Sequence, residues 1–163
     1  MLKEENKKRY IMSLEENKAI VRRFIEELNK RNIAIMDELV APAMGHPTLR
    51  VQGLEEYKQF ETALWKAFPD WHETILDMVA EGDKVWLLAE VTATHKGEWL
   101  SFLPYINRKV RLAPTGKETK FTYVGLYRIV DGKIAERLSI HAIADFFRDI
   151  GVIEYKDLSE DAS

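Results

Sequence analysis

Apolar and polar residues follow a helical spacing near the start of the chain. Ser13 and Glu16 form the S-x-x-E pattern of a capping box. Apolar residues then recur every three or four positions as far as Leu28, with charged residues on the opposite face. This pattern predicts an amphipathic helix that begins after Ser13 and ends within 29–32.

Two further helices are expected before the pattern changes. Residues 33–40 predict a short helix, which stops before Pro42 because the residue ahead of a proline avoids the helical conformation. Residues 41–51 contain two prolines and a glycine, and they predict a loop. A third helix is expected to open at Gly53 and to end at Pro69. Its apolar stripe consists of Leu54, Tyr57, Phe60, Leu64 and Phe68.

From Trp71 onward the apolar residues alternate with polar ones, which is the period of β-strands. The strands expected from this alternation cover 74–79, 84–95, 119–130 and 133–143. Residues 99–114 follow no regular pattern, and a short helix or turn is expected at 145–150. Helices followed by strands indicate an α+β fold. A curled sheet with its helices on one face would bury the apolar stripes and could enclose a pocket.

The last two strands flank Asp131-Gly132, a typical two-residue hairpin turn. Such a turn pairs Val130 with Lys133, and the register then continues by strict alternation. The face expected to line the pocket carries Phe121, Tyr123, Gly125, Tyr127, Glu136, Leu138, Ile140 and Ala142. The opposite face carries Thr122, Val124, Leu126, Arg128, Ala135, Arg137, Ser139 and His141. On this register His141 points away from the pocket, and only a β-bulge would turn it inward.

Composition narrows the class of protein. The chain has 163 residues, of which 46% are hydrophobic and 31% charged, and its net charge is −3. These values suit one soluble globular domain and argue against a nucleic-acid binder. Because the chain has no cysteine, disulfides, thiol chemistry and cysteine-based metal sites are excluded. No apolar stretch is long enough to span a membrane, so a cytoplasmic protein without membrane contact is expected.

Polar segments flank the predicted domain. Residues 1–12 are expected to form a polar N-terminal extension, residues 13–153 the domain, and residues 154–163 a polar C-terminal tail.

Several short motifs, taken together, resemble the SnoaL-like polyketide cyclase family over roughly residues 14–153. The motifs are Phe68-Pro69-Asp70, Glu81-Gly82-Asp83-Lys84-Val85, Thr94-His95-Lys96-Gly97-Glu98, Pro114-Thr115-Gly116-Lys117, Tyr127-Arg128-Ile129-Val130-Asp131-Gly132-Lys133-Ile134 with Glu136, and Ile150-Gly151. The resemblance implies the cone-shaped nuclear transport factor 2-like fold, with three N-terminal helices packed on a strongly curved mixed sheet. It also implies a pocket inside the cone and a homodimer.

The resemblance further implies an intramolecular aldol cyclisation that needs neither metal nor organic cofactor. In that family an aspartate near the end of the last strand serves as acid and base, with a tryptophan earlier in the strand. Here the corresponding positions are Ala142 and Leu138. Alanine cannot carry a proton. Residues 100–113 are also longer than the usual link, and they could fold over the mouth of the cone.

Two functions therefore stay open. The first is a cofactor-free cyclase or isomerase that acts on a polyketide-like or other apolar cyclic compound. The second is a non-catalytic ligand-binding or dimerisation module with the same fold. The two differ in whether a replacement base lies in the pocket.

The candidate catalytic residues are His141 and Glu136. Histidine suits a general base because its ordinary pKa is about 6.5. Glu136 shares the predicted pocket face with Tyr127. The alternative is a surface charge beside Arg128, and the family's usual glutamate at this position favours that structural role. The residues expected to bind substrate are Tyr123, Tyr127, Phe121, Leu138, Ala142, His46, Trp71, His95 and Trp99. Each of the aromatic ones could instead be ordinary core.

No metal site is expected. The four histidines, His46, His72, His95 and His141, are far apart in the sequence and show no metal-ligand spacing. The sequence also lacks a Gly-rich phosphate loop and a G-x-S-x-G motif.

Overall fold

The computed structural model describes residues 13–103, 108–141 and 143–153. Its elements run in the order α1 (Leu14–Asn29), α2 (Ile35–Leu39), β1 (Val40–His46), a 3₁₀ turn (Pro47–Leu49), β2 (Val51–Gln52), α3 (Leu54–Ala67), β3 (His72–Glu81), β4 (Lys84–Thr94), β5 (Trp99–Leu103), β6 (Arg108–Leu112), β7 (Glu118–Val130), β8 (Lys133–His141) and α4 (Ile143–Asp149). The expected α+β class is confirmed, and α4 adds a helix to the three N-terminal ones.

The first helix begins where the capping box predicts. The Ser13 hydroxyl accepts a hydrogen bond from the Glu16 backbone at 3.2 Å, and the Glu16 carboxylate accepts one from the Ser13 backbone at 2.7 Å. Two of the helix's orphan amide groups are thereby satisfied, which explains the clean start of α1 at Leu14.

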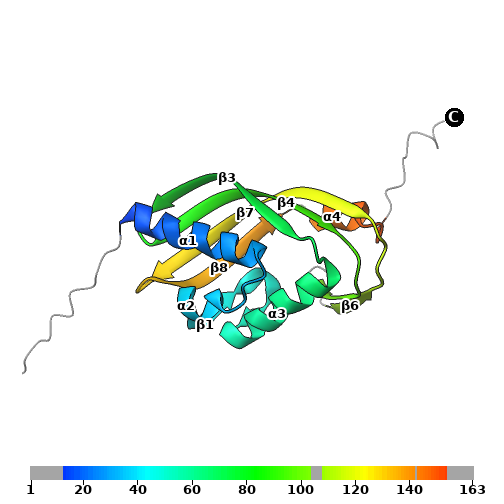
Figure 1. Ribbon diagram of the computed structural model, residues 1–163, viewed down its shortest axis with the longest axis horizontal. Coiled ribbons are helices and arrows are strands. Elements are labelled where there is room, and N and C mark those ends of the chain that lie inside the picture. Colours follow the sequence, from blue (N-terminus) through cyan, green and yellow to red (C-terminus); the bar gives the residue numbers. More distant parts are fainter. Residues whose placement is uncertain (1–12, 104–107, 142, 154–163) are drawn as a thin grey trace, which may run out of the picture.

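One strongly curved mixed sheet forms the centre of the molecule. Its strands lie in the order β2-β1-β8-β7-β4-β3, with β1 parallel to β8 and the other pairs antiparallel. Figure 1 shows the long strands β3, β4 and β7 arching over α1, α2 and α3. The sheet therefore has one helix-covered concave face and one open face.

Two segments differ from the sequence prediction. Residues 41–51 contain strand β1 rather than only a loop, and Pro42 pairs with neither neighbouring strand, so its missing amide breaks no ladder bond. Residues 99–114 are not irregular throughout, because β5 and β6 form a two-stranded sheet. Tertiary pairing stabilises both segments despite their weak local signals.

The core divides into two apolar clusters. The larger one packs α1, α2 and α3 against the concave face of the sheet. The smaller one is rich in aromatic residues and joins the end of α3, β5 and α4, with Phe68, Trp99 and Phe146 in mutual ring contact. None of the described helices is long and apolar enough to cross a membrane.

Candidate functional site

A bulge in β8 decides which of its side chains face the concave side. Beyond the Asp131-Gly132 turn, Ile129 pairs with Ile134, but Arg128 then pairs with Glu136, so that Ala135 has no partner on β7. One extra residue in a strand shifts every later residue to the opposite face. The following pairs are Tyr127 with Arg137, Gly125 with Ser139, and Tyr123 with His141.

The strict alternation predicted from the sequence is therefore wrong beyond this bulge. Glu136 lies on the open face and forms an ion pair with Arg128 at 3.2 Å. Leu138 pairs with Leu126 on the same open face, so neither Glu136 nor Leu138 lines the pocket. His141, predicted to point outward, faces the concave side. Ala142 lies outside the described residues.

A cavity of about 720 Å³ lies between α3 and the concave side of the sheet. Of the candidate residues predicted from the sequence, those that line it are His46, Trp71, Trp99, Phe121, Tyr123 and His141. Tyr127 is fully buried beneath the Arg137 guanidinium, whose carbon lies 5.3 Å from the ring centre. His95 is not among the lining residues; it stacks on Phe68 with ring centres 4.9 Å apart.

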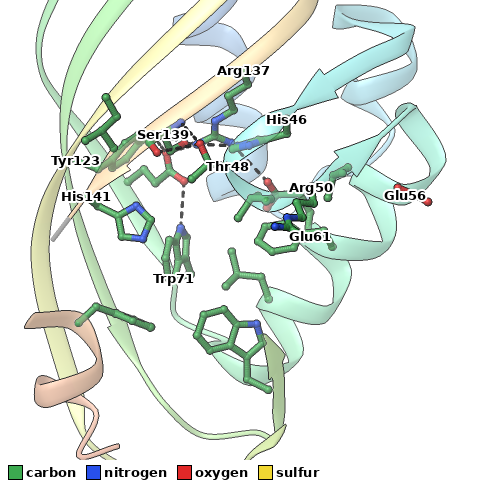
Figure 2. A pocket seen from close by; sticks show the side chains of 18 of the residues that line it. His46, Thr48, Arg50, Glu56, Glu61, Trp71, Tyr123, Arg137, Ser139 and His141 are labelled. Carbon is green, nitrogen blue, oxygen red and sulfur yellow. Dashed lines mark hydrogen bonds and ion pairs between the residues drawn. The ribbon is translucent and has the colours of Figure 1, made fainter. Parts of the chain in front are cut away.

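Arg137 is the centre of a buried polar cluster at one end of this cavity (Figure 2). The side chain is buried, and its guanidinium donates to the Tyr57 hydroxyl at 2.5 Å and to the Tyr123 hydroxyl at 3.2 Å. Two carboxylates lie nearby: Glu61 at 3.6 Å and Glu73 at 3.7 Å from guanidinium nitrogens. The cluster therefore places one cation beside two acids.

The two carboxylates differ in how they are held. Glu73 accepts a hydrogen bond from the Tyr123 hydroxyl at 2.5 Å through one oxygen and from the Trp71 indole at 3.1 Å through the other. Glu61 is 4% exposed. Among the described residues its one ion-pair partner is Arg137, whose nearest nitrogen lies 3.6 Å away, which is beyond hydrogen-bond distance. Burial raises the pKa of Glu61 to about 7, with Glu73 adding to the rise and Arg137 opposing it.

The three tyrosines around Arg137 stay protonated. Burial raises the pKa of the Tyr57, Tyr123 and Tyr127 hydroxyls above the ordinary value, and the positive charge of Arg137 opposes this rise. These phenols therefore act as fixed neutral dipoles rather than as proton carriers near neutral pH.

Two histidines face the cavity as neutral rings. Burial and the positive charge of Arg137 lower the pKa of His141, whose ring lies 5.8 Å from that of Phe121. The same two causes lower the pKa of His46 to about 3. His46 Nε2 lies 3.5 Å from the Ser139 hydroxyl, whereas no hydrogen bond joins the His141 ring to any residue in the described ranges.

The sequence did not predict several residues of the site. Glu61 sits four residues after Tyr57 and three before Leu64, on the apolar stripe of α3. A carboxylate within an apolar stripe could have indicated a functional or paired residue, since buried acids are rare unless they are paired. Arg137 and Ser139 were predicted on the outer face, and only the bulge brings them inside.

The arrangement can carry acid and base chemistry on an apolar ligand. Aromatic and aliphatic walls surround a small set of polar groups, with a neutral imidazole and a carboxyl that titrates near pH 7 among them. The described residues hold no cluster of three or more potential metal ligands.

Solved structures with the same fold cover most of this chain. TsrD from Streptomyces laurentii has a TM-score of 0.74 at 18% identity, covering 87% of this chain and 99% of that protein. A protein from Jannaschia sp. CCS1, provisionally assigned as a SnoaL-like polyketide cyclase, has a TM-score of 0.73 at 20% identity, covering 86% and 95%.

Solved structures with this fold have been assigned more than one activity. AclR from Streptomyces galilaeus is provisionally assigned as a hydroxylase and has a TM-score of 0.71 at 24% identity, covering 87% of this chain and 100% of that protein. At such identities the likeness establishes the fold alone.

The family comparison reaches further than these structures. No curated protein matches the chain. The family model described as SnoaL-like polyketide cyclase matches residues 19–150, which run from within α1 to just after α4. The chain therefore belongs to the SnoaL-like polyketide cyclase family.

Proposed function

We propose that this protein is a cofactor-free acid/base enzyme of the cyclase or isomerase class. Its substrate is an apolar, carbonyl-bearing cyclic or polyketide-like compound, and His141 is the general base. The observation that carries the proposal is the inward orientation of the His141 ring, which lines the cavity (Figure 2). His141 directly precedes Ala142 in the sequence, where the family aspartate is absent, which supports His141 as the replacement base.

Proton removal from the substrate requires a base that is unprotonated at working pH and that can contact the ligand. Burial and Arg137 lower the pKa of His141, so that its ring is neutral at pH 7. A neutral imidazole can remove a proton from the carbon beside a ketone, which is the first step of both aldol closure and isomerisation. The cavity volume of about 720 Å³ accommodates a compound of two or more rings.

The test is deuterium exchange into 2-tetralone, a bicyclic ketone, followed by NMR in D₂O. We expect the protein to exchange the protons beside the carbonyl faster than buffer alone. His141→Gln should lower that rate by about 100-fold, because it removes the base while keeping polarity. His72→Gln is the matched control, since His72 is exposed at the start of β3. If His141→Gln exchanges as fast as the unaltered protein, the proposal is wrong; if 2-tetralone binds without exchange, the chain is a ligand-binding module.

We also propose that the protein forms a homodimer through the open face of the sheet and that it works in the cytoplasm. Support for the dimer comes from Leu88, Val124 and Ile140, which form a cross-strand row on that face and are each more than a third exposed. Exposed apolar rows of this kind are characteristic of protein interfaces.

A further inference from the structure

One guanidinium lies beside two buried carboxylates, and its single positive charge can balance only one negative charge. Glu73 is the better held, with each oxygen accepting a hydrogen bond. Two carboxylates that share a low-dielectric site cannot both ionise without a large cost, so one retains a proton. Glu61, 3.6 Å from the guanidinium, is the carboxyl that can hold and release that proton without breaking the Glu73 contacts.

Glu61 is also placed to meet a ligand. It lines the cavity from α3, whereas His141 lines it from β8, and Figure 2 shows the two side chains on different sides of the same space. The groups that act on Glu61 are Arg137 from β8, Glu73 from β3, Tyr57 from α3 and the more distant Arg31. The tyrosine and the arginines cannot accept its proton, because the phenol stays neutral and the arginines stay charged. Both Glu73 oxygens already accept hydrogen bonds from Trp71 and Tyr123.

We propose that Glu61 is the general acid of the site and donates its proton to the substrate's carbonyl oxygen while His141 removes a proton from the adjacent carbon. This role rests on the proposed function. The carbon–hydrogen bond breaks, its electron pair forms the carbon–carbon double bond of an enol, and the oxygen gains the proton that Glu61 loses. His141 becomes charged and Glu61 becomes a carboxylate, so no charge accumulates on the substrate. The proton on His141 then exchanges with a deuteron of D₂O. His141 delivers that deuteron to the carbon while the enol oxygen returns its proton to the Glu61 carboxylate, which restores the ketone and both residues.

The reaction should therefore have two pH limits. His141 must be neutral, so the exchange rate rises with pH through its lowered pKa. Glu61 must be protonated, so the rate falls as pH rises through about 7. The two limits predict a bell-shaped profile.

The experiment measures 2-tetralone exchange from pH 4 to 9 in the full chain and in three variants. Glu61→Gln should lose the falling limb above pH 7 and should exchange at least about tenfold more slowly at pH 6. Glu61→Asp keeps a carboxyl and should keep a falling limb at a reduced rate. Glu55→Gln, an exposed change on the same helix, should match the unaltered protein at every pH.

The outcomes separate this proposal from the one it rests on. If exchange depends on His141 but Glu61→Gln retains both its rate and its falling limb, Glu61 is a structural partner of Arg137 and the proposal is overturned. If the exchange rate is the same with and without His141, the proposed function itself is wrong. If Glu61→Gln fails to fold, ¹³C NMR of the glutamate carboxyls in the unaltered protein is the deciding measurement. A buried carboxyl that titrates near pH 7 and shifts when 2-tetralone is added supports the proposal. If no carboxyl behaves in this way, the proposal is overturned.

Discussion

Arg137 shows how one residue organises a buried site. Its guanidinium contacts side chains from three elements: Tyr57 and Glu61 of α3, Glu73 of β3, and Tyr123 and Tyr127 of β7. A planar fork with several donors suits such a crowded set better than the single point charge of a lysine. The cluster gains its order from the hydrogen bonds that surround the charge, because the ion pairs alone would barely repay the loss of hydration.

Removing this cation should be costly. Arg137→Met would leave Glu73 buried without a counter-charge, and we expect the free energy of unfolding to fall by about 3–5 kcal/mol. Arg128→Met is the matched control, because Arg128 forms its ion pair with Glu136 on the exposed face. That change should cost no more than about 1 kcal/mol. Urea denaturation followed by circular dichroism measures both, and equal losses would contradict a special role for the buried cluster.

The bulge at Ala135 acts on the scale of the whole strand. Ile134 is buried below it and Arg137 is buried above it, although strict alternation would place these two on opposite faces. The extra residue thus converts the outward set of Arg137, Ser139 and His141 into the inward set. Bulges are frequent next to active sites because they re-aim side chains in this way.

Two single-residue deletions in β8 test whether the bulge sets which side chains face the cavity. Deleting Ala135 should leave Arg137 opposite Tyr127, so the protein should stay folded with His141-dependent exchange of 2-tetralone. Deleting Leu138 should turn Ser139 and His141 to the open face and lower the exchange rate to the level of His141→Gln. Circular dichroism checks that each variant is folded. An Ala135 deletion that abolishes exchange while Leu138 deletion preserves it would show that the register is set elsewhere.

At the scale of the whole molecule, the two faces of the sheet have different partners. The concave face is covered by helices and holds the cavity, whereas the open face carries the row of Leu88, Val124 and Ile140. A curved sheet with one covered face leaves the other available to a second copy.

The proposed dimer predicts a mass near twice the chain's 19.0 kDa by light scattering. Val124→Lys, in the middle of the exposed row, should shift the protein toward a single chain, because a charge would be buried against an apolar surface. Ala63→Lys, on the exposed side of α3, should leave the mass unchanged. A single-chain mass for the unaltered protein would overturn the dimer.

The sequence by itself determined the local elements of this protein. The Ser13–Glu16 capping box set the start of α1, the stripe around Tyr57 and Leu64 predicted α3, and Asp131-Gly132 predicted the hairpin between β7 and β8. These signals are local, because caps, periodicity and turn residues act over a few neighbouring positions. The motifs spread along the chain were enough to indicate the family.

Only the tertiary structure decided the site. Strand β1 forms because β8 provides a partner, and the bulge that turns His141 inward has no local mark at Ala135. Glu61, Glu73 and Arg137 are far apart in the sequence and meet only when α3, β3 and β8 pack around one cavity. Burial by these long-range contacts is also what moves the pKa of Glu61 to about 7, a property that no short stretch of sequence contains.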